Sequence, residues 1–213
     1  MFSKRFLFRF QFPCKHIDAA SVTALDKTYQ LPDLLELENS VEHCALFCRC
    51  RSAWNESGLL FSASISGKQQ RPWCRAEMPE SSDGLQLFID TRNIKDIHRA
   101  SRFCHRLLVM PSGSGQGNTE PTVIWLPIPR AKEHPKPIDL KLLQVRSAFA
   151  DDGYRLDLFL PGKILTGYEP REHSEIGFHY SLIDKEYSNL SFSAAPPLPA
   201  DQDPSLWTAL QLI

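Results

Sequence analysis

The densest group of side chains that could do chemistry lies between Arg92 and Arg106. Four arginines and two histidines fall within these fifteen residues: Arg92, His98, Arg99, Arg102, His105 and Arg106. A guanidinium group presents a planar fork of N–H donors, so several arginines directed into one cleft would suit a carboxylate, sulfate or phosphate group. The competing interpretation is a solvated loop in which the arginines pair with Asp83, Asp90 and Asp96, as exposed ions often do.

Two other residue types raise the question of a metal ion. Cys44, Cys48 and Cys50 share one strand parity, whereas a zinc site ordinarily uses a Cys-x-x-Cys turn that brings its ligands together. We therefore expect small buried thiols there, and all six cysteines are predicted to be reduced, because a chain of 213 residues needs no disulfide staples. No metal or cofactor is predicted, since the acidic calcium candidates do not alternate densely along any loop. These candidates are Asp83, Asp90, Asp96 and Asp184.

Alternation of apolar and polar residues dominates the elements that must position these groups. One hairpin is predicted over 41–51 and 59–66, and a second over 140–150 and 154–160. Further strands are expected at 83–90, 176–183 and 206–213, and only 93–103 could hold a helical turn. The pattern predicts a single all-β domain over residues 1–213, an antiparallel β-sandwich with at most one or two short helical turns.

The charge balance and the N-terminal residues limit the partners of the chain. With 24 basic and 25 acidic residues, no field of one sign indicates nucleic acid or an anionic membrane. The phenylalanines at positions 6, 8, 10 and 12 alternate like a strand, and Arg9 and Gln11 interrupt any apolar core of a signal peptide. No apolar run approaches the roughly 20 residues that span a bilayer. We expect a cytoplasmic protein, and its oligomeric state stays open.

A series of short motifs in a particular order indicates a family. The series runs through Gly58-Leu59-Leu60-Phe61-Ser62, the strand Asp83 to Asp90, Tyr154 to Pro161, Ile176-Gly177-Phe178 with Asp184, and Asp203-Pro204-Ser205-Leu206-Trp207 with Leu210 and Leu212. In this order the chain resembles a family 9 carbohydrate-binding module, one of the DOMON-like β-sandwiches. The resemblance covers residues 40–213, and residues 1–39 would add an N-terminal strand and a connection packed on the domain.

The resemblance implies a domain that binds sugars at chain ends without catalysis, by clamping a ring between two tryptophans. Aromatic faces suit the C–H groups of a pyranose ring. The first clamp position lies shortly before Asp83, where the nearest tryptophan is Trp73, and the second falls at about Asp201. The polar contacts would fall on Gln86, Arg106 and Ser181.

These observations lead to a predicted function and a predicted site. We expect a non-catalytic domain that binds a carbohydrate or a similar polar ligand. The basic residues make an acidic or sulfated saccharide the candidate ligand. Trp73 would stack, Gln86 would bind hydroxyls, and the basic residues would hold the anionic groups. The predicted ligand-binding residues are Trp73, Gln86, Arg92, His98, Arg102 and Arg106. Two alternatives stay open: a DOMON-like haem or cofactor binder that uses His105, His179 or Met110, and a domain that binds only a partner protein.

Overall fold

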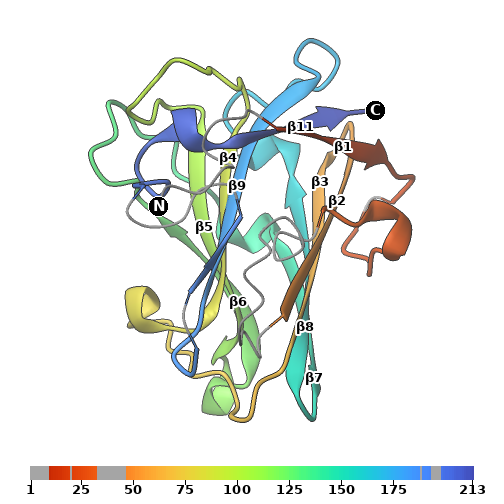
Figure 1. The fold of residues 1–213 in the computed structure, drawn as a ribbon, viewed down its shortest axis with the longest axis vertical. Helices are drawn as coiled ribbons and strands as arrows, with labels where there is room; N and C mark the ends of the chain where they lie inside the picture. The colour runs from red at the N-terminus through yellow and green to blue at the C-terminus, as the bar shows by residue number, and fades with distance from the viewer. Residues whose placement is uncertain (1–9, 20, 33–46, 188, 193–197) are drawn as a thin grey trace.

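The computed structural model describes residues 10–19, 21–32, 47–187, 189–192 and 198–213, and strands joined by turns make up this part of the chain (Figure 1). The strands of these residues are β1 (Gln11–His16), β2 (Phe47–Asn55), β3 (Gly58–Ser66), β4 (Gly84–Asp90), β5 (Cys104–Ser114), β6 (Glu120–Leu126), β7 (Gln144–Ala150), β8 (Gly153–Pro161), β9 (Glu175–Ile183), β10 (Leu190–Ser191) and β11 (Thr208–Leu212). The prediction of an all-β fold is confirmed.

Short 3-10 turns are more frequent than the sequence indicated. Within the described ranges they are η2 (Lys27–Tyr29), η3 (Pro79–Ser81), η4 (Gln116–Asn118), η5 (Leu140–Leu142), η6 (Gly162–Ile164) and η7 (Pro204–Leu206). In η2, η5 and η7 the side chain of the preceding aspartate accepts a backbone N–H of the turn. Such a cap stabilises one turn without any helical periodicity. The prediction of at most one or two helical turns was therefore wrong, and residues 93–103 hold no helix.

The strands form one continuous mixed sheet, in the order β6-β5-β4-β9-β11-β1-β2-β3-β8-β7, with β10 added to β9. The expected purely antiparallel arrangement fails at β1, which runs parallel to both β11 and β2. The sheet folds over at β1, so that β6-β5-β4-β9-β11 (the β4 layer) faces β2-β3-β8-β7 (the β3 layer) (Figure 1). The edge strands β6 and β7 also make contact, which nearly closes the sheet into a barrel-like shape.

The core lies between the two layers and follows the predicted alternation. Leu59, Phe61, Ala63 and Ile65 of β3 and Tyr154, Leu156, Leu158 and Leu160 of β8 all point into it. The rings of Phe61 and Phe178 stack across the interior with centroids 5.4 Å apart and planes only 4° from parallel. Because β4 also alternates, Leu85, Leu87 and Ile89 enter the core. The even-numbered residues of β4 are therefore left for the opposite, outer face of its layer.

The C-terminal part of the basic segment is a buried strand rather than a solvated loop. β5 begins at Cys104 and pairs with both β4 and β6, so His105 and Arg106 lie inside the sheet. Leu107 and Val109 point into the core, whereas Leu108 and Met110 belong to a cluster on the outer face of the β4 layer. Both faces of β5 are covered, which removes the alternation that would have marked it as a strand.

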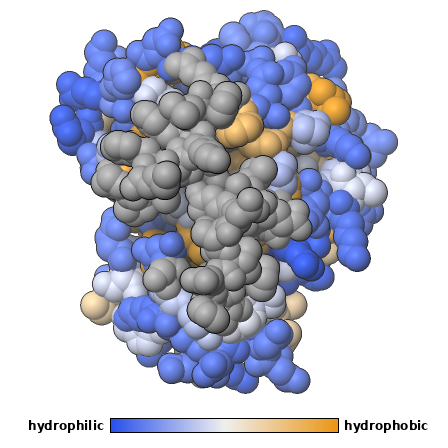
Figure 2. All heavy atoms as spheres, in the orientation of Figure 1, coloured by the Kyte–Doolittle hydropathy of each residue, from blue (hydrophilic) through white to orange (hydrophobic). Residues whose placement is uncertain are grey.

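The remaining predictions about the ends and the thiols have mixed outcomes. Five cysteines are buried and free of disulfides, as expected, and Cys44 lies outside the described residues. Phe12 lies in β1 and stacks beside Phe10, whereas Phe6 and Phe8 lie outside the described residues. Where the chain is described, no helix is long and apolar enough to cross a membrane. One face of the described surface is mainly hydrophilic with small apolar patches (Figure 2).

Candidate functional site

The three polar positions that the resemblance assigns to a ligand lie side by side on the outer face of the β4 layer. Gln86 of β4 is the direct partner of Ser181 in β9. Arg106 of β5 is paired with Phe88, two residues farther along β4. The Nε of Arg106 donates a hydrogen bond to Oε1 of Gln86 at 3.3 Å. Strand register therefore brings together residues from three separate parts of the sequence.

Arg106 is held from several sides. Its Nη1 donates to the carbonyl oxygen of Pro127 at 3.4 Å, and its Nη2 lies 3.3 Å from a carboxylate oxygen of Glu80. The side chain of Arg106 is only 7% exposed, whereas that of Glu80 is 66% exposed. We call Glu80, Gln86, Arg106 and Ser181 the Gln86–Arg106 cluster. Its buried cation is already paired with a carboxylate, and Glu80 is the member that reaches the surface.

Trp73 is held beside Asp83, the residue before β4, and two cations lie over its ring. The Nζ of Lys185 lies 3.3 Å from the centroid of the Trp73 ring, and Cζ of Arg75 lies 5.7 Å from it. Both cations are exposed, and neither has an ion-pair partner among the described residues. We call Trp73, Arg75 and Lys185 the Trp73 site. An anionic group could contact these two unpaired cations, and a sugar ring could stack on the face that Lys185 covers only if Lys185 moved aside.

The carboxylate of Asp83 positions the Trp73 site. Its Oδ2 accepts a hydrogen bond from the backbone N–H of Trp73 at 2.9 Å, and its Oδ1 accepts one from the N–H of Lys185 at 2.8 Å. The N–H of Asp83 donates in turn to the carbonyl oxygen of Trp73 at 2.8 Å. The adjacent Cys74 packs with Leu108 and Met110, so this loop lies against the outer face of the β4 layer.

The predicted residues beyond the other end of β4 do not join this arrangement. Trp73 is bonded to Asp83, whereas Arg92 follows Asp90, and the seven residues of β4 separate these ends by about 20 Å. Arg92 and Arg102 lie over the ring of Phe103, with their Cζ atoms 5.1 and 5.0 Å from its centroid. The structure therefore brings Gln86 and Arg106 into contact and groups Arg92 with Arg102, far from Trp73.

The partners of the basic residues also differ from those expected of a solvated loop. Arg92 pairs with Glu169 at 2.7 Å, and Arg106 pairs with Glu80 at 3.3 Å. The Nδ1 of His98 lies 3.0 Å from Oδ2 of Asp203. Asp90 instead accepts the backbone N–H groups of the turn that follows it. Arg92, His98 and Arg106 thus each have a carboxylate already in contact, which weakens an anion-binding role.

The aspartates considered for calcium converge only in part, and they do so around an ammonium group. The Nζ of Lys68 lies 2.5 Å from Asp184, 3.4 Å from Glu186 and 3.7 Å from Asp83. Burial alone would lower the pKa of Lys68, but the hydrogen bond to Asp184 and the three negative charges outweigh it and raise that pKa. A calcium ion does not fit among these carboxylates while Lys68 is there, because its charge and place are already taken.

The candidate haem ligands lie on different faces of the β4 layer. His105 shares the core-facing parity of Leu107, and its Nε2 accepts a hydrogen bond from the N–H of Thr166 at 3.0 Å. His179 is paired with Phe88 on the outer face. Met110 also lies on that face, but near Gly84, four residues or about 13 Å along the strands from His179. No two of the three side chains can therefore bind the same iron.

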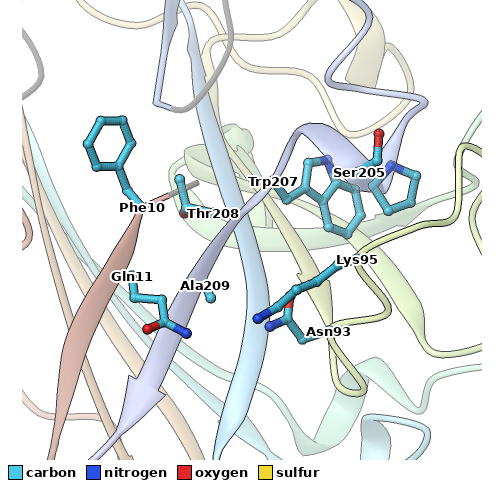
Figure 3. A pocket seen from close by; sticks show the side chains of 9 residues that line it. Phe10, Gln11, Asn93, Lys95, Ser205, Trp207, Thr208 and Ala209 are labelled. Carbon is cyan, nitrogen blue, oxygen red and sulfur yellow. The ribbon is translucent and has the colours of Figure 1, made fainter. Parts of the chain in front are cut away.

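A small cavity lies between the starts of β1 and β11 and the loop after β4 (Figure 3). Its volume is about 230 Å³, below the roughly 300–1,000 Å³ of most small-molecule sites. Glu175 accepts hydrogen bonds from Gln11 and Asn93 and pairs with Lys95. Trp207, which lines the cavity, is buried and donates its Nε1–H to the carbonyl oxygen of Ala200. The polar lining is thus largely occupied within the protein.

Comparisons with other proteins identify the fold. No protein-family model matches the sequence, and a search of curated proteins finds no match. A family 9 carbohydrate-binding module from Caldicellulosiruptor kristjanssonii, in complex with cellotriose, aligns at 13% identity and a TM-score of 0.66, over 95% of this chain and 93% of that one. A complex of such a module from the same organism with glucose aligns at 12% identity and a TM-score of 0.64, over 96% of each chain. The predicted resemblance to the family 9 fold is confirmed.

Several residues of the site were missed from the sequence. Glu80 and Lys185 carry no motif, and each becomes visible only through its contact with a residue far away in the chain. Arg75 is a neighbour of Trp73 in the sequence, and its position over the ring is seen only in the structure. Asp83 did carry a signal, because Asp83-Gly84 marks a turn before a strand. That signal indicated a turn, but it did not indicate that the Asp83 carboxylate accepts the backbone N–H groups of Trp73 and Lys185.

Proposed function

We propose that this chain is a non-catalytic carbohydrate-binding domain whose ligand meets the outer face of the β4 layer. The supporting observation is that Gln86, Arg106 and Ser181 form one patch in a chain with the fold of family 9 modules. Modules with this fold have been seen with cellotriose and with glucose. Trp73 would supply the stacking ring and the Gln86–Arg106 cluster the polar contacts, about three residues or 10 Å farther along β4.

The ligand class follows from which cations are already paired. Arg92, His98 and Arg106 have carboxylate partners, whereas Arg75 and Lys185 have none in the described chain. We infer that the sugar carries a carboxylate or sulfate group and that this group lies beside Trp73, between Arg75 and Lys185. The anionic contacts are thereby assigned to Arg75 and Lys185, and no longer to Arg92, His98, Arg102 and Arg106, where the sequence placed them.

The carboxylates near the site serve structural roles, which supports binding without catalysis. Glu80 pairs with Arg106, and both oxygens of Asp83 accept backbone N–H groups. A hydrolase of sugars would need two carboxyl groups facing the scissile bond, one of them as an acid. The proposal therefore includes no reaction, and the expected cytoplasmic location stays a prediction.

Isothermal titration calorimetry tests this function. The protein is titrated with glucose, with cellotriose, with a uronic acid disaccharide and with a sulfated disaccharide. We expect saturable binding of the acidic or sulfated sugars, and at least a tenfold loss of affinity in Trp73→Ala and in Arg106→Met. Arg155→Ala is the matched control, because Arg155 lies on β8 in the other layer.

The outcome depends on both the ligand and the variants. If no saccharide binds, the proposed function is wrong. Binding that Trp73→Ala and Arg106→Met leave unchanged would place the ligand elsewhere and contradict the proposed site. Circular dichroism of each variant shows whether the fold is intact before any loss of binding is interpreted.

A further inference from the structure

A second, larger pocket lies on the β3 layer, away from the proposed sugar site. Its volume is about 690 Å³, within the range typical of small-molecule sites. It lies between the turn that joins β2 to β3, the η5 turn, and the η6 turn that follows β8. The Trp73 site belongs instead to the outer face of the β4 layer. The two sites therefore share no residue and can be tested separately.

The polar groups that line this pocket are mostly donors. Lys141 and Lys163 are exposed, and neither ammonium group has a hydrogen bond or an ion pair within the described ranges. The Oε1 of Gln144 accepts a hydrogen bond from the N–H of Val22 at 2.9 Å, which leaves its amide nitrogen as a donor. The pocket thus presents three donors, two of them cations. Such a lining matches the oxygens of a carboxylate, sulfate or phosphate group.

The single acid of the pocket does not cancel these cations. Glu56 is exposed, and its Oε2 lies 3.3 Å from Nε2 of His16, which lies outside the lining of the pocket. Its own backbone hydrogen bond and that to His16 lower its pKa, so Glu56 is ionised and directed toward His16. The excess of positive charge in the pocket remains with Lys141 and Lys163. An anion entering the pocket would therefore meet unpaired cations and no preformed internal partner.

The floor of the pocket is aromatic and firmly held. The hydroxyl of Tyr168 donates to the carbonyl oxygens of Asn55 and Gly58, at 2.7 and 3.0 Å. Its ring lies directly over Gly162, where a Cβ atom would come within 2.3 Å of the ring. Because the hydroxyl is occupied, a ligand would meet the ring of Tyr168 rather than its polar tip. Phe159 adds a second aromatic side chain to the same lining.

We propose that this pocket binds a small ring-shaped ligand with an oxyanion group, of the class of uronic acids and sugar phosphates. The ring would pack on Tyr168, and the anionic group would lie between Lys141 and Lys163. Uronic acids and sugar phosphates have the same two features, a saturated ring and a carboxylate or phosphate group attached to it. This site does not depend on the proposed function, because none of its residues belongs to the Trp73 site or to the Gln86–Arg106 cluster.

Ligand-observed NMR and calorimetry test the proposal with four probes: glucuronate, glucose 6-phosphate, glucose and inorganic phosphate. We expect glucuronate, glucose 6-phosphate or both to bind, and at least tenfold more tightly than glucose or phosphate. The double variant Lys141→Gln/Lys163→Gln should lose at least tenfold in affinity. Lys132→Gln is the matched control, because Lys132 donates its N–H to the carbonyl oxygen of Ala100, beside the other layer.

Two further variants separate the ring contact from the charge. Tyr168→Phe keeps the ring and should retain most of the affinity, whereas Tyr168→Leu should lose it while the fold is preserved. The proposal is overturned if neither anionic sugar binds, if the double lysine variant binds as tightly as the wild type, or if phosphate alone binds as tightly as glucose 6-phosphate. Trp73→Ala should leave this binding unchanged, which distinguishes it from the proposed function.

Discussion

The ammonium nitrogen of Lys68 lies 3.7 Å from a carboxylate oxygen of Asp83, and each of these side chains is only 2% exposed. Asp184 and Glu186 contact the same nitrogen, so three separate segments of the chain meet at one buried cation. Asp83 also fixes the backbone of Trp73 and Lys185. Asp83 therefore belongs both to the buried ion cluster around Lys68 and to the support of the proposed sugar site.

Replacing Lys68 by methionine should strongly destabilise the protein. The variant leaves buried carboxylates without their cation, and loss of one partner from a buried ion group costs about 3–5 kcal/mol. Urea denaturation measures the change in free energy of unfolding. Lys95→Met is the control, since Lys95 pairs with Glu175 at a half-exposed site and its loss should cost about 1 kcal/mol at most. Equal effects of the two substitutions would contradict the structural role of Lys68.

A smaller residue at position 68 should create a cation dependence that the natural chain lacks. In Lys68→Ala the oxygens of Asp83, Asp184 and Glu186 would surround an unfilled space, and such oxygens are the ligands that Ca²⁺ prefers. Binding to the folded state alone raises the melting temperature. We expect millimolar Ca²⁺ to raise the melting temperature of the variant and to leave that of the wild type unchanged. A similar rise in both proteins would show that Ca²⁺ acts elsewhere.

The two buried histidines should make the fold sensitive to mild acid. Burial lowers the pKa of His105 to about 4 and that of His179 to about 3. In the unfolded chain each imidazole binds a proton near pH 6.5. Below pH 6.5 the unfolded state therefore binds more protons, and stability falls by up to about 1.4 kcal/mol per pH unit for each histidine until the folded pKa is reached.

Urea denaturation between pH 7.5 and pH 5 measures this slope. His179→Gln should reduce it, because one of the two titrating groups is gone. If the free energy of unfolding is flat between pH 6.5 and pH 5 in the wild type, the two imidazoles are not buried as neutral groups.

Lys185→Ala should separate the two parts of sugar recognition at Trp73. The ammonium group covers the Trp73 ring at 3.3 Å, so its removal uncovers the aromatic face while it deletes a proposed contact with the anionic group. Calorimetry should show at least a tenfold loss of affinity for an acidic disaccharide, whereas cellotriose should bind the variant no more weakly than it binds the wild type. The control is Lys27→Ala, on the η2 turn. Equal losses for both sugars would mean that Lys185 only supports the fold.

The strands that could be predicted from sequence are those with one wet and one dry face. In β3 the apolar Leu59, Phe61, Ala63 and Ile65 alternate with smaller or polar residues, and this determined both the strand and its orientation. β5 was missed because it is covered on both sides and carries His105 and Arg106 within the sheet. Buried polar residues of this kind look like a loop until their partners are known.

The sequence predicted those site residues that belong to short motifs, but not the contacts between distant segments. Gln86, Arg106 and Ser181 were assigned from the order of motifs, and cross-strand register brings them together. The ion pairs could not be predicted in the same way, because Arg106 contacts Glu80 through the packing of a turn against a strand. The separation of Trp73 from Arg92 likewise depends on the hydrogen bond that holds Trp73 to Asp83 at the start of β4, which no local motif indicates.

The parallel pairing of β1 with β11 constrains the order in which this chain can be assembled. Gln11 pairs with Ala209, and the N–H of Ile213 donates to the carbonyl oxygen of Cys14. During synthesis β1 therefore leaves the ribosome long before its partner exists, and one of its edges stays unpaired until nearly the whole of this sequence has been translated. Pairing between strands so far apart in the sequence slows folding, and the unpaired edge of β1 could meanwhile pair with another chain and aggregate. A circular permutant in which β1 follows β11 through a linker would shorten the sequence separation of this pair and should fold faster.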